Sequence, residues 1–81
     1  MKFLWPDSAR AELRRIGRET AVRILQALTD YAASGAGDVK ALSGEWQGHF
    51  RLRVADYRVV FTISPDEITI VRVRHRSDVY R

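Results

Sequence analysis

The spacing of apolar residues changes once along this chain, and that change constrains the fold more than any other feature. Between residues 7 and 34 apolar side chains recur every three to four positions, whereas from residue 49 onward they alternate with polar side chains. The first spacing places side chains on one face of a helix, and the second places them on one face of a strand. The order of the two patterns predicts an α+β fold in which helices pack on one face of an antiparallel sheet.

Residues 7–34 predict two helices that pack as an antiparallel hairpin, because the segment that joins them is short. A short N-terminal strand precedes the hairpin and ends at Pro6, and Asp7 or Ser8 is the expected N-cap of the first helix. The apolar stripe of the first helix comprises Ala9, Leu13 and Ile16. The apolar face of the second helix, over residues 19–34, comprises Ala21, Ile24, Leu25, Leu28, Tyr31 and Ala32.

Two glycines, Gly17 and Gly35, are expected to end the helices. The glycine-rich segment 35–48 that follows has no regular period and is expected to form a loop that crosses from the helices to the sheet. Trp46 is expected to anchor this loop by packing on the core, and we favour that role over stacking on a nucleic-acid base.

Residues 49–75 predict three antiparallel strands joined as a meander. The segment 64–67 places a proline at the second position of a type I turn. Between the first two strands only Ala55 and Asp56 are available, and a two-residue turn requires a positive φ that Asp tolerates better than Ala. This turn sets a register in which Val54 pairs with Tyr57, Arg53 with Arg58, Leu52 with Val59, Arg51 with Val60 and Phe50 with Phe61.

In this register three arginines share the face of the sheet that the helices leave open, namely Arg51, Arg53 and Arg58. Arg53 lies directly opposite Arg58, and like charges in such a pair destabilise a sheet by up to roughly 1 kcal/mol. Neither strand places an acidic residue beside them, and guanidinium groups bind phosphate oxygens in pairs. The residues therefore predict a phosphate-binding site, with a solvated polar face as the alternative.

The third strand adds basic residues whose orientation the alternation leaves open. In one phase Arg72 and Arg74 share a face with Ile70, and His75 lies on the opposite face, but a bulge would exchange these positions. His75 is a candidate general base because a histidine side chain ordinarily titrates near neutrality, and a structural role is the alternative. Tyr80 is a candidate proton donor or a platform on which a base stacks.

The charge of the chain is unevenly distributed. The 14 Lys and Arg residues outnumber the 10 Asp and Glu residues, and residues 49–81 hold seven Arg against four acidic residues. Clustered arginine is typical of a surface that binds a polyanion such as nucleic acid. A general preference for Arg over Lys would explain their ratio but not this clustering.

Length and composition exclude several classes of protein. A chain of 81 residues has room for one domain, residues 1–81, which we expect to end in a polar tail at residues 76–81. Without Cys there are neither disulfides nor thiolate metal sites, and we expect no metal and no cofactor. No apolar run approaches the roughly 20 residues of a membrane span, and the N-terminus does not suit a signal peptide. We expect a cytoplasmic protein with no membrane partner.

Four short segments occur in an order and at spacings typical of one family of small proteins. They are Leu42-Ser43-Gly44, the strand from Gly48 to Val54, the strand from Asp56 to Phe61, and the terminal segment from His75 to Tyr80. Together they resemble the RelE/ParE superfamily of type II toxins, and the resemblance covers nearly the whole chain. It implies a toxin that a cognate antitoxin holds inactive.

In RelE-like members this resemblance implies a metal-independent endoribonuclease that cleaves mRNA in the ribosomal A site and so inhibits translation. The residues expected to take part in catalysis are Arg51, Arg53, Arg58, Arg74, His75 and Tyr80. Those expected to bind RNA are Arg51, Arg53, Arg58, Arg72, Arg74, Arg76 and Arg81. Because Arg is effectively never deprotonated, the base is His75 or Tyr80, unless electrostatics and the geometry imposed by the ribosome carry the reaction.

Two other functions remain open on the sequence. One is a ParE-like poison of DNA gyrase, which uses the same scaffold without a ribonuclease site. The other is a non-catalytic binding module that acts with its antitoxin as a co-repressor. The expected partners are the cognate antitoxin, the ribosome with A-site mRNA, and operator DNA reached indirectly through the antitoxin.

Overall fold

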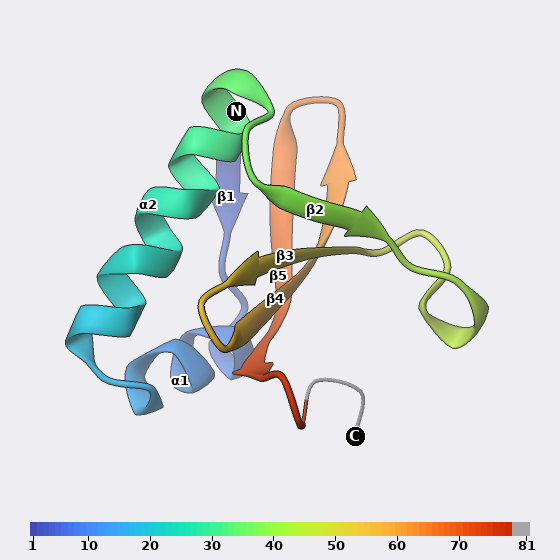
Figure 1. The fold of residues 1–81 in the computed structure, drawn as a ribbon. Helices are drawn as coiled ribbons and strands as arrows, with labels where there is room; N and C mark the ends of the chain where they lie inside the picture. The colour runs from blue at the N-terminus through green and yellow to red at the C-terminus, as the bar shows by residue number, and fades with distance from the viewer. Residues whose placement is uncertain (79–81) are drawn as a thin grey trace.

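The computed structural model describes residues 1–78 of the chain and has the predicted α+β class (Figure 1). The elements are β1 (Lys2–Leu4), α1 (Asp7–Arg15), α2 (Arg18–Ser34), β2 (Asp38–Ala41), the short 3-10 helix η1 (Gly44–Trp46), β3 (Phe50–Val54), β4 (Tyr57–Ser64) and β5 (Glu67–His75). A short N-terminal strand and two helices thus precede the main sheet, as the sequence predicts.

The described strands form one sheet in the order β1-β5-β4-β3-β2 (Figure 1). The predicted antiparallel meander is present as β3, β4 and β5, but it is the centre of a larger sheet. At one edge β1 pairs in parallel with β5, with Phe3 opposite Ile68. At the other edge β2 pairs antiparallel with β3, with Val39 opposite Leu52. The expectation of a three-stranded sheet is therefore incomplete.

Both added strands are short, and neither is specified by a local pattern. The segment 35–48, expected to be a loop, contains β2, whose four residues hold too few alternations to establish a period. The partner of β1 lies near the other end of the chain, so their pairing depends on long-range contact. Strand formation here follows from pairing with a neighbour more than from intrinsic propensity.

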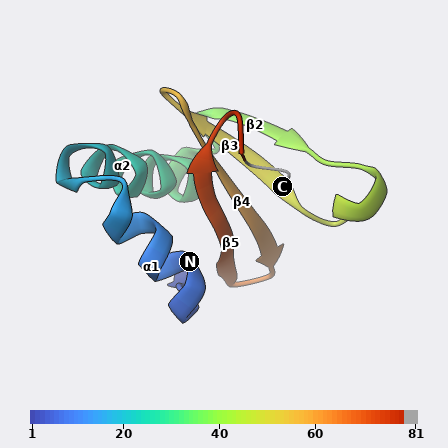
Figure 2. The same cartoon turned by 90° about the horizontal axis from the view of Figure 1, so that it is seen from below.

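The two α-helices lie on one side of the sheet, and within residues 1–78 no α-helix covers the other side (Figure 2). The first helix, α1, packs mainly on β5, and α2 packs on β3. The helices also contact each other, and in both views they form a V that opens from their connection. The uncovered side of the sheet is called the open face below.

The helix ends differ in part from the prediction. The N-cap position of α1 is occupied by Pro6, so the expectation of Asp7 or Ser8 at that position is wrong. Asp7 instead lies in the first turn, where a negative charge interacts favourably with the helix dipole. Gly17 has a φ of 94° and begins α2 rather than closing α1, whereas Gly35 ends α2 as predicted, with its N–H bonded at 2.8 Å to the carbonyl four residues earlier.

Side chains from both helices and from the covered face of the sheet form the hydrophobic core. Its buried members are Ala9, Ile24, Leu28, Leu52, Val59, Phe61, Ile68, Ile70 and Val73. The ring of Tyr31 in α2 packs 5.6 Å from that of Phe61, between centroids. Leu25, predicted to face the core, is 43% exposed, because one residue along a helix turns the side chain by about 100° away from Ile24. The core holds the sheet rigidly beneath its open face.

Candidate functional site

The β3–β4 hairpin adopts the register that the sequence predicts, with Arg53 opposite Arg58 and Arg51 opposite Val60. Ala55, the first turn residue, takes the positive φ that the turn requires, at 53°. Since Leu52 and Val59 are in the core, the arginines alternate onto the open face. The hairpin thus brings together Arg51, Arg53 and Arg58, as expected.

Arg51 pairs with an acid, and its side chain is less exposed than those of Arg23 and Arg74, which also pair with acids. Its Nη2 lies 3.5 Å from Oδ1 of Asp38, and its side chain is 21% exposed. Its Nε is buried and has no hydrogen-bond partner among the described residues. An unsatisfied buried donor costs roughly 1–3 kcal/mol, and such strain is typical of functional sites.

Strand β2 brings two charged residues to the open face that the sequence did not assign to it. In the β2–β3 register Lys40 lies opposite Arg51, and Asp38 lies opposite Arg53. Strands β3 and β4 contribute no acid, as expected, but β2 contributes Asp38. The sequence signal that could have placed both residues is the polar–apolar alternation around half-buried Val39. That alternation spans only the four residues of β2, too few to predict a strand. We refer to Lys40, Arg51, Arg53 and Arg58 as the cation cluster.

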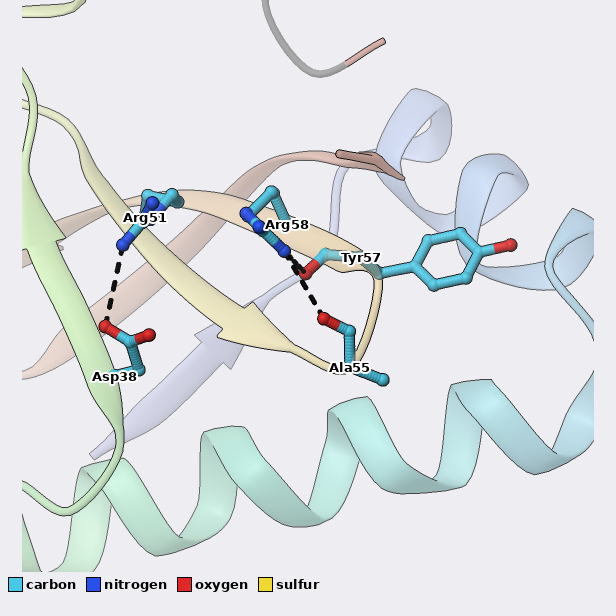
Figure 3. A network of polar contacts seen from close by, with 5 residues as sticks. All are labelled: Asp38, Arg51, Ala55, Tyr57 and Arg58. Carbon is cyan, nitrogen blue, oxygen red and sulfur yellow. Dashed lines mark hydrogen bonds and ion pairs between the residues drawn. The ribbon is translucent and has the colours of Figure 1, made fainter. Parts of the chain in front are cut away.

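Arg58 lies at the centre of the mutual repulsion within the cation cluster. Burial lowers its pKa from the ordinary value, and the charges of Arg53, Arg51 and Arg76 lower it further, whereas Asp38 raises it. Its Nη1 donates to the carbonyl oxygens of Tyr57 and Ala55, at 3.1 and 3.4 Å (Figure 3). Arg remains protonated at physiological pH, so a bound anion would relieve this repulsion.

A bulge in the β4–β5 pairing decides which residues of β5 reach the open face. Val60 pairs with Arg72 but the next residue, Phe61, pairs with Ile70, so one residue of β5 is skipped. Arg72 is therefore on the open face while Ile70 is in the core. The phase that placed Arg72 and Arg74 on the side of Ile70 is wrong, and the alternative with a bulge holds.

Trp46 lies over Arg72, with the guanidinium carbon 4.7 Å from the ring centroid. Its ring also makes an edge contact with His49, at 5.4 Å between centroids. The expectation that Trp46 packs on the core is wrong, because the core cluster lies on the other side of the sheet. Burial lowers the pKa of Arg72, and Arg74 lowers it further while Glu12 raises it.

Arg74 lies opposite Arg58 in the sheet, yet its guanidinium contacts α1. Its Nε donates to Oε2 of Glu12 at 2.7 Å. The contact lies at the side of β5 that α1 covers. Arg74 therefore borders the cation cluster but is held at its margin.

His75 lies opposite Tyr57, and the two rings make an edge contact at 5.6 Å. Figure 3 shows the Tyr57 side chain directed away from Arg51 and Arg58, toward the helices. Both Tyr57 and His75 line a pocket of about 270 Å³, whose other lining residues are Glu12, Arg15, Ile16, Val73, Arg74 and Asp78. The sheet thus separates His75 from the cation cluster.

The end of the described chain brings a further cation back to the open face. The backbone N–H of Arg76 donates to the carbonyl of Asp56 at 2.8 Å, which extends the ladder past β5, and its charge acts on Arg58. Tyr80 and Arg81, predicted to act in catalysis and RNA binding, lie outside the described residues.

Within residues 1–78 no group of three or more His, Cys, Asp or Glu side chains is placed to hold a metal ion. None of the helices in that part of the chain has the length and apolar character that crossing a membrane requires.

Several solved structures share this fold. The YoeB/ParE toxin from Agrobacterium tumefaciens matches 93% of this chain and 98% of its own, with 19% identity and a TM-score of 0.77. The toxin–antitoxin complex RelBE2 from Mycobacterium tuberculosis matches over 93% and 96%, with 24% identity and a TM-score of 0.79. The RelB–RelE antitoxin–toxin complex from Methanococcus jannaschii matches over 95% and 94%, with 23% identity and a TM-score of 0.76. The TM-scores show a common fold, and at identities below 25% they show the fold alone.

The family is shown by the sequence itself. Residues 3–80 match the family model described as ParE toxin of type II toxin–antitoxin system, parDE. The chain therefore belongs to this family and is a type II toxin of the RelE/ParE superfamily, which confirms the resemblance seen in its motifs. A search of curated proteins finds no match.

Proposed function

We propose that this toxin acts in the cytoplasm as a ribosome-dependent endoribonuclease, which cleaves mRNA in the A site and so inhibits translation. The observation that supports the proposal is the cation cluster, in which four basic side chains converge on a sheet face that holds a single opposing carboxylate, Asp38, within the β2–β4 strands. Such a cluster is costly without an anion, and guanidinium groups bind phosphate through paired hydrogen bonds.

The proposed reaction needs no metal ion. The 2′-oxygen attacks the adjacent phosphorus, the bond from phosphorus to the 5′-oxygen breaks, and a 2′,3′-cyclic phosphate and a 5′-hydroxyl result. The proton of the 2′-hydroxyl passes to a base, and the leaving 5′-oxygen takes up a proton. Negative charge builds on the phosphoryl oxygens, where Arg51, Arg53 and Arg58 would stabilise it.

Proton transfer cannot be assigned to the cation cluster, because Arg does not release its proton at physiological pH. His75 lies on the other side of the sheet, and both contacts of its Nδ1 are with Ser77, through the hydroxyl at 3.0 Å and the backbone N–H at 3.3 Å. Because Nδ1 accepts the Ser77 N–H, the proton of the neutral imidazole is on Nε2, from which His75 would donate to the leaving 5′-oxygen. We propose His75 and Tyr80 as the candidates, with the remaining acceleration supplied by electrostatics and by substrate geometry on the ribosome.

We propose a cognate antitoxin as the partner that holds the toxin inactive and links it to operator DNA. Support comes from the relatives in Mycobacterium tuberculosis and Methanococcus jannaschii, which were solved as toxin–antitoxin complexes. An acidic segment laid over the cation cluster would neutralise it and exclude RNA. The affinity of such a complex should fall as salt rises.

A second candidate function is poisoning of DNA gyrase, which the ParE description of the matched family favours. A third, a non-catalytic module that binds the antitoxin as a co-repressor, would retain the fold without either toxic activity.

Primer extension on mRNA from a translating extract separates these functions. The wild-type toxin should cut at A-site positions, only when ribosomes are present, and Arg58→Gln should abolish the cuts without loss of antitoxin binding. Arg23→Gln is the matched control, since Arg23 lies on the exposed face of α2 and pairs with Glu19. If growth arrest survives Arg58→Gln and the toxin inhibits supercoiling by gyrase, the protein is a gyrase poison and not a ribonuclease. If the wild-type toxin shows neither activity, the non-catalytic binding module remains.

A further inference from the structure

Glu12 in α1 is an acidic side chain that turns toward the sheet. Its side chain is 14% exposed, and both of its oxygens bind β5. Oε1 accepts the backbone N–H of Val73 at 2.8 Å, and Oε2 accepts Nε of Arg74 at 2.7 Å. These two contacts tie a side chain of α1 directly to the strand that bears the predicted site residues.

The first contact compensates for the short length of β1. That strand pairs with β5 as far as Thr69, opposite Leu4. Farther along this edge the backbone of β5 runs past α1 rather than past a strand, and a buried N–H there requires an acceptor. The carboxylate of Glu12 provides it at Val73.

The second contact fixes the orientation of Arg74. A hydrogen bond between a guanidinium and a carboxylate is charge-assisted, and the distance of 2.7 Å is at the short end of the range. Because Glu12 is itself held by the Val73 N–H, it cannot follow Arg74 if that side chain moves. The Arg74 side chain remains 35% exposed beside Arg58, its partner across the sheet.

We propose that Glu12 is a positioning residue, which holds the Arg74 guanidinium at the margin of the cation cluster so that an RNA phosphate meets it already oriented. This rests on the proposed function. A long arginine side chain that is ordered before binding loses less conformational entropy when the phosphate arrives. The role of Glu12 is thus exerted through Arg74 and not by contact with RNA.

A double-mutant cycle tests this, with Glu12→Gln, Arg74→Ala and the combined variant. In the wild-type background Glu12→Gln should lower kcat for ribosome-dependent cleavage by up to about a hundredfold, the order of loss that follows a misplacement of about 1 Å. In the Arg74→Ala background it should cause no further loss. Thermal unfolding should shift more in the wild-type background, because Glu12→Gln there weakens both the Val73 contact and the ion pair with Arg74, whereas in the Arg74→Ala background only the Val73 contact is left to weaken.

The controls separate positioning from a general effect on the fold. Glu19→Gln makes the same chemical change on the exposed face of α2 and should leave cleavage unchanged. Glu12→Asp keeps the charge but shortens the reach, so it should give an intermediate loss and serves as the test if Glu12→Gln does not fold. An equal loss of kcat from Glu12→Gln with and without Arg74 overturns the inference.

The affinity of each variant in the cycle for a fluorescently labelled single-stranded RNA is also measured, so the inference does not depend on cleavage. If the wild-type toxin cuts no mRNA, the proposed function fails, but Glu12→Gln should still weaken RNA binding in the wild-type background alone. A loss of binding that is the same in both backgrounds overturns the inference. So does a wild-type toxin that binds no RNA, because Arg74 then has no phosphate to meet.

Discussion

Replacing Asp38 with asparagine should tighten RNA binding, although it removes an ion pair. Asp38 Oδ1 lies 3.5 Å from Nη2 of Arg51, so an RNA phosphate that binds Arg51 competes with this carboxylate. Asp38→Asn retains the size of the side chain and removes its charge. The cation cluster then loses its internal competitor.

The magnitude follows from the exposure of the pair. The Asp38 side chain is 57% exposed, and ion pairs in such a setting contribute about 0–1 kcal/mol. A difference of about 1 kcal/mol is about fivefold in an equilibrium constant, so Kd for RNA should fall by up to that factor. If the released Arg51 makes one further phosphate contact, the slope of log Kd against log salt should steepen by about 0.7.

Fluorescence anisotropy with a labelled single-stranded RNA, titrated between about 50 and 300 mM salt, measures both quantities. Asp30→Asn is the matched control, because Asp30 lies on α2, on the other side of the sheet, where it accepts a hydrogen bond from Gln26 at 2.9 Å. Weaker binding by Asp38→Asn, or an unchanged Kd together with an unchanged salt slope, would refute a phosphate contact at Arg51. Equal effects of the two variants would refute it too, since net charge alone would then explain them.

Two further variants test the strain in the hairpin. Ala55→Gly should stabilise the fold by about 1 kcal/mol in urea denaturation, because a left-handed conformation at φ 53° costs a residue with a Cβ about that much. The control Ala33→Gly, in α2, should instead destabilise the fold by about 1 kcal/mol. If Ala55→Gly gives no gain in stability, the turn is not strained. Arg53→Thr should weaken RNA binding yet stabilise the fold by about 0.2–1 kcal/mol at low salt, because it removes a like charge opposite Arg58. Burial lowers the pKa of Arg58, and the charge of Arg53 lowers it further, so folding disfavours the charged form of Arg58. Because Arg stays protonated between about pH 6 and pH 9, the gain in stability from Arg53→Thr should persist across that range. A gain that does not shrink as salt rises would contradict the electrostatic cause.

The arginine hairpin could be predicted from the sequence because everything that determines it is local. The alternation in residues 50–54 and 57–63 leaves one two-residue turn between the strands, and this places Arg53 opposite Arg58. A slip of one residue would carry the arginines into the core, so the apolar pattern excludes other registers. The family could be predicted for a similar reason, since its motifs are short segments of continuous sequence.

The prediction was weaker wherever the chain has to choose a partner. The apolar stripe of α1 and most of that of α2 face the core as predicted, but Leu25, about 100° around the helix from Ile24, lies at the edge of the apolar face and is 43% exposed. A helical pattern alone does not show how wide the covered face is, so the burial of a residue at its edge depends on what packs against the helix. Trp46 likewise packs over Arg72 because β5 brings that guanidinium beneath it.

By itself the sequence determined the α+β class, the order of its helices and central strands, the paired arginines and the family. Tertiary structure alone decided the rest of the candidate site. Pairing of β2 with β3 brings Asp38 and Lys40 to the open face, and a bulge turns Arg72 there while the core keeps Ile70. Glu12 meets Val73, 61 residues away in the chain. Periodicity reports which neighbours share a face of one element, whereas pairings, bulges and ion pairs depend on distances between elements that exist only once the chain has folded.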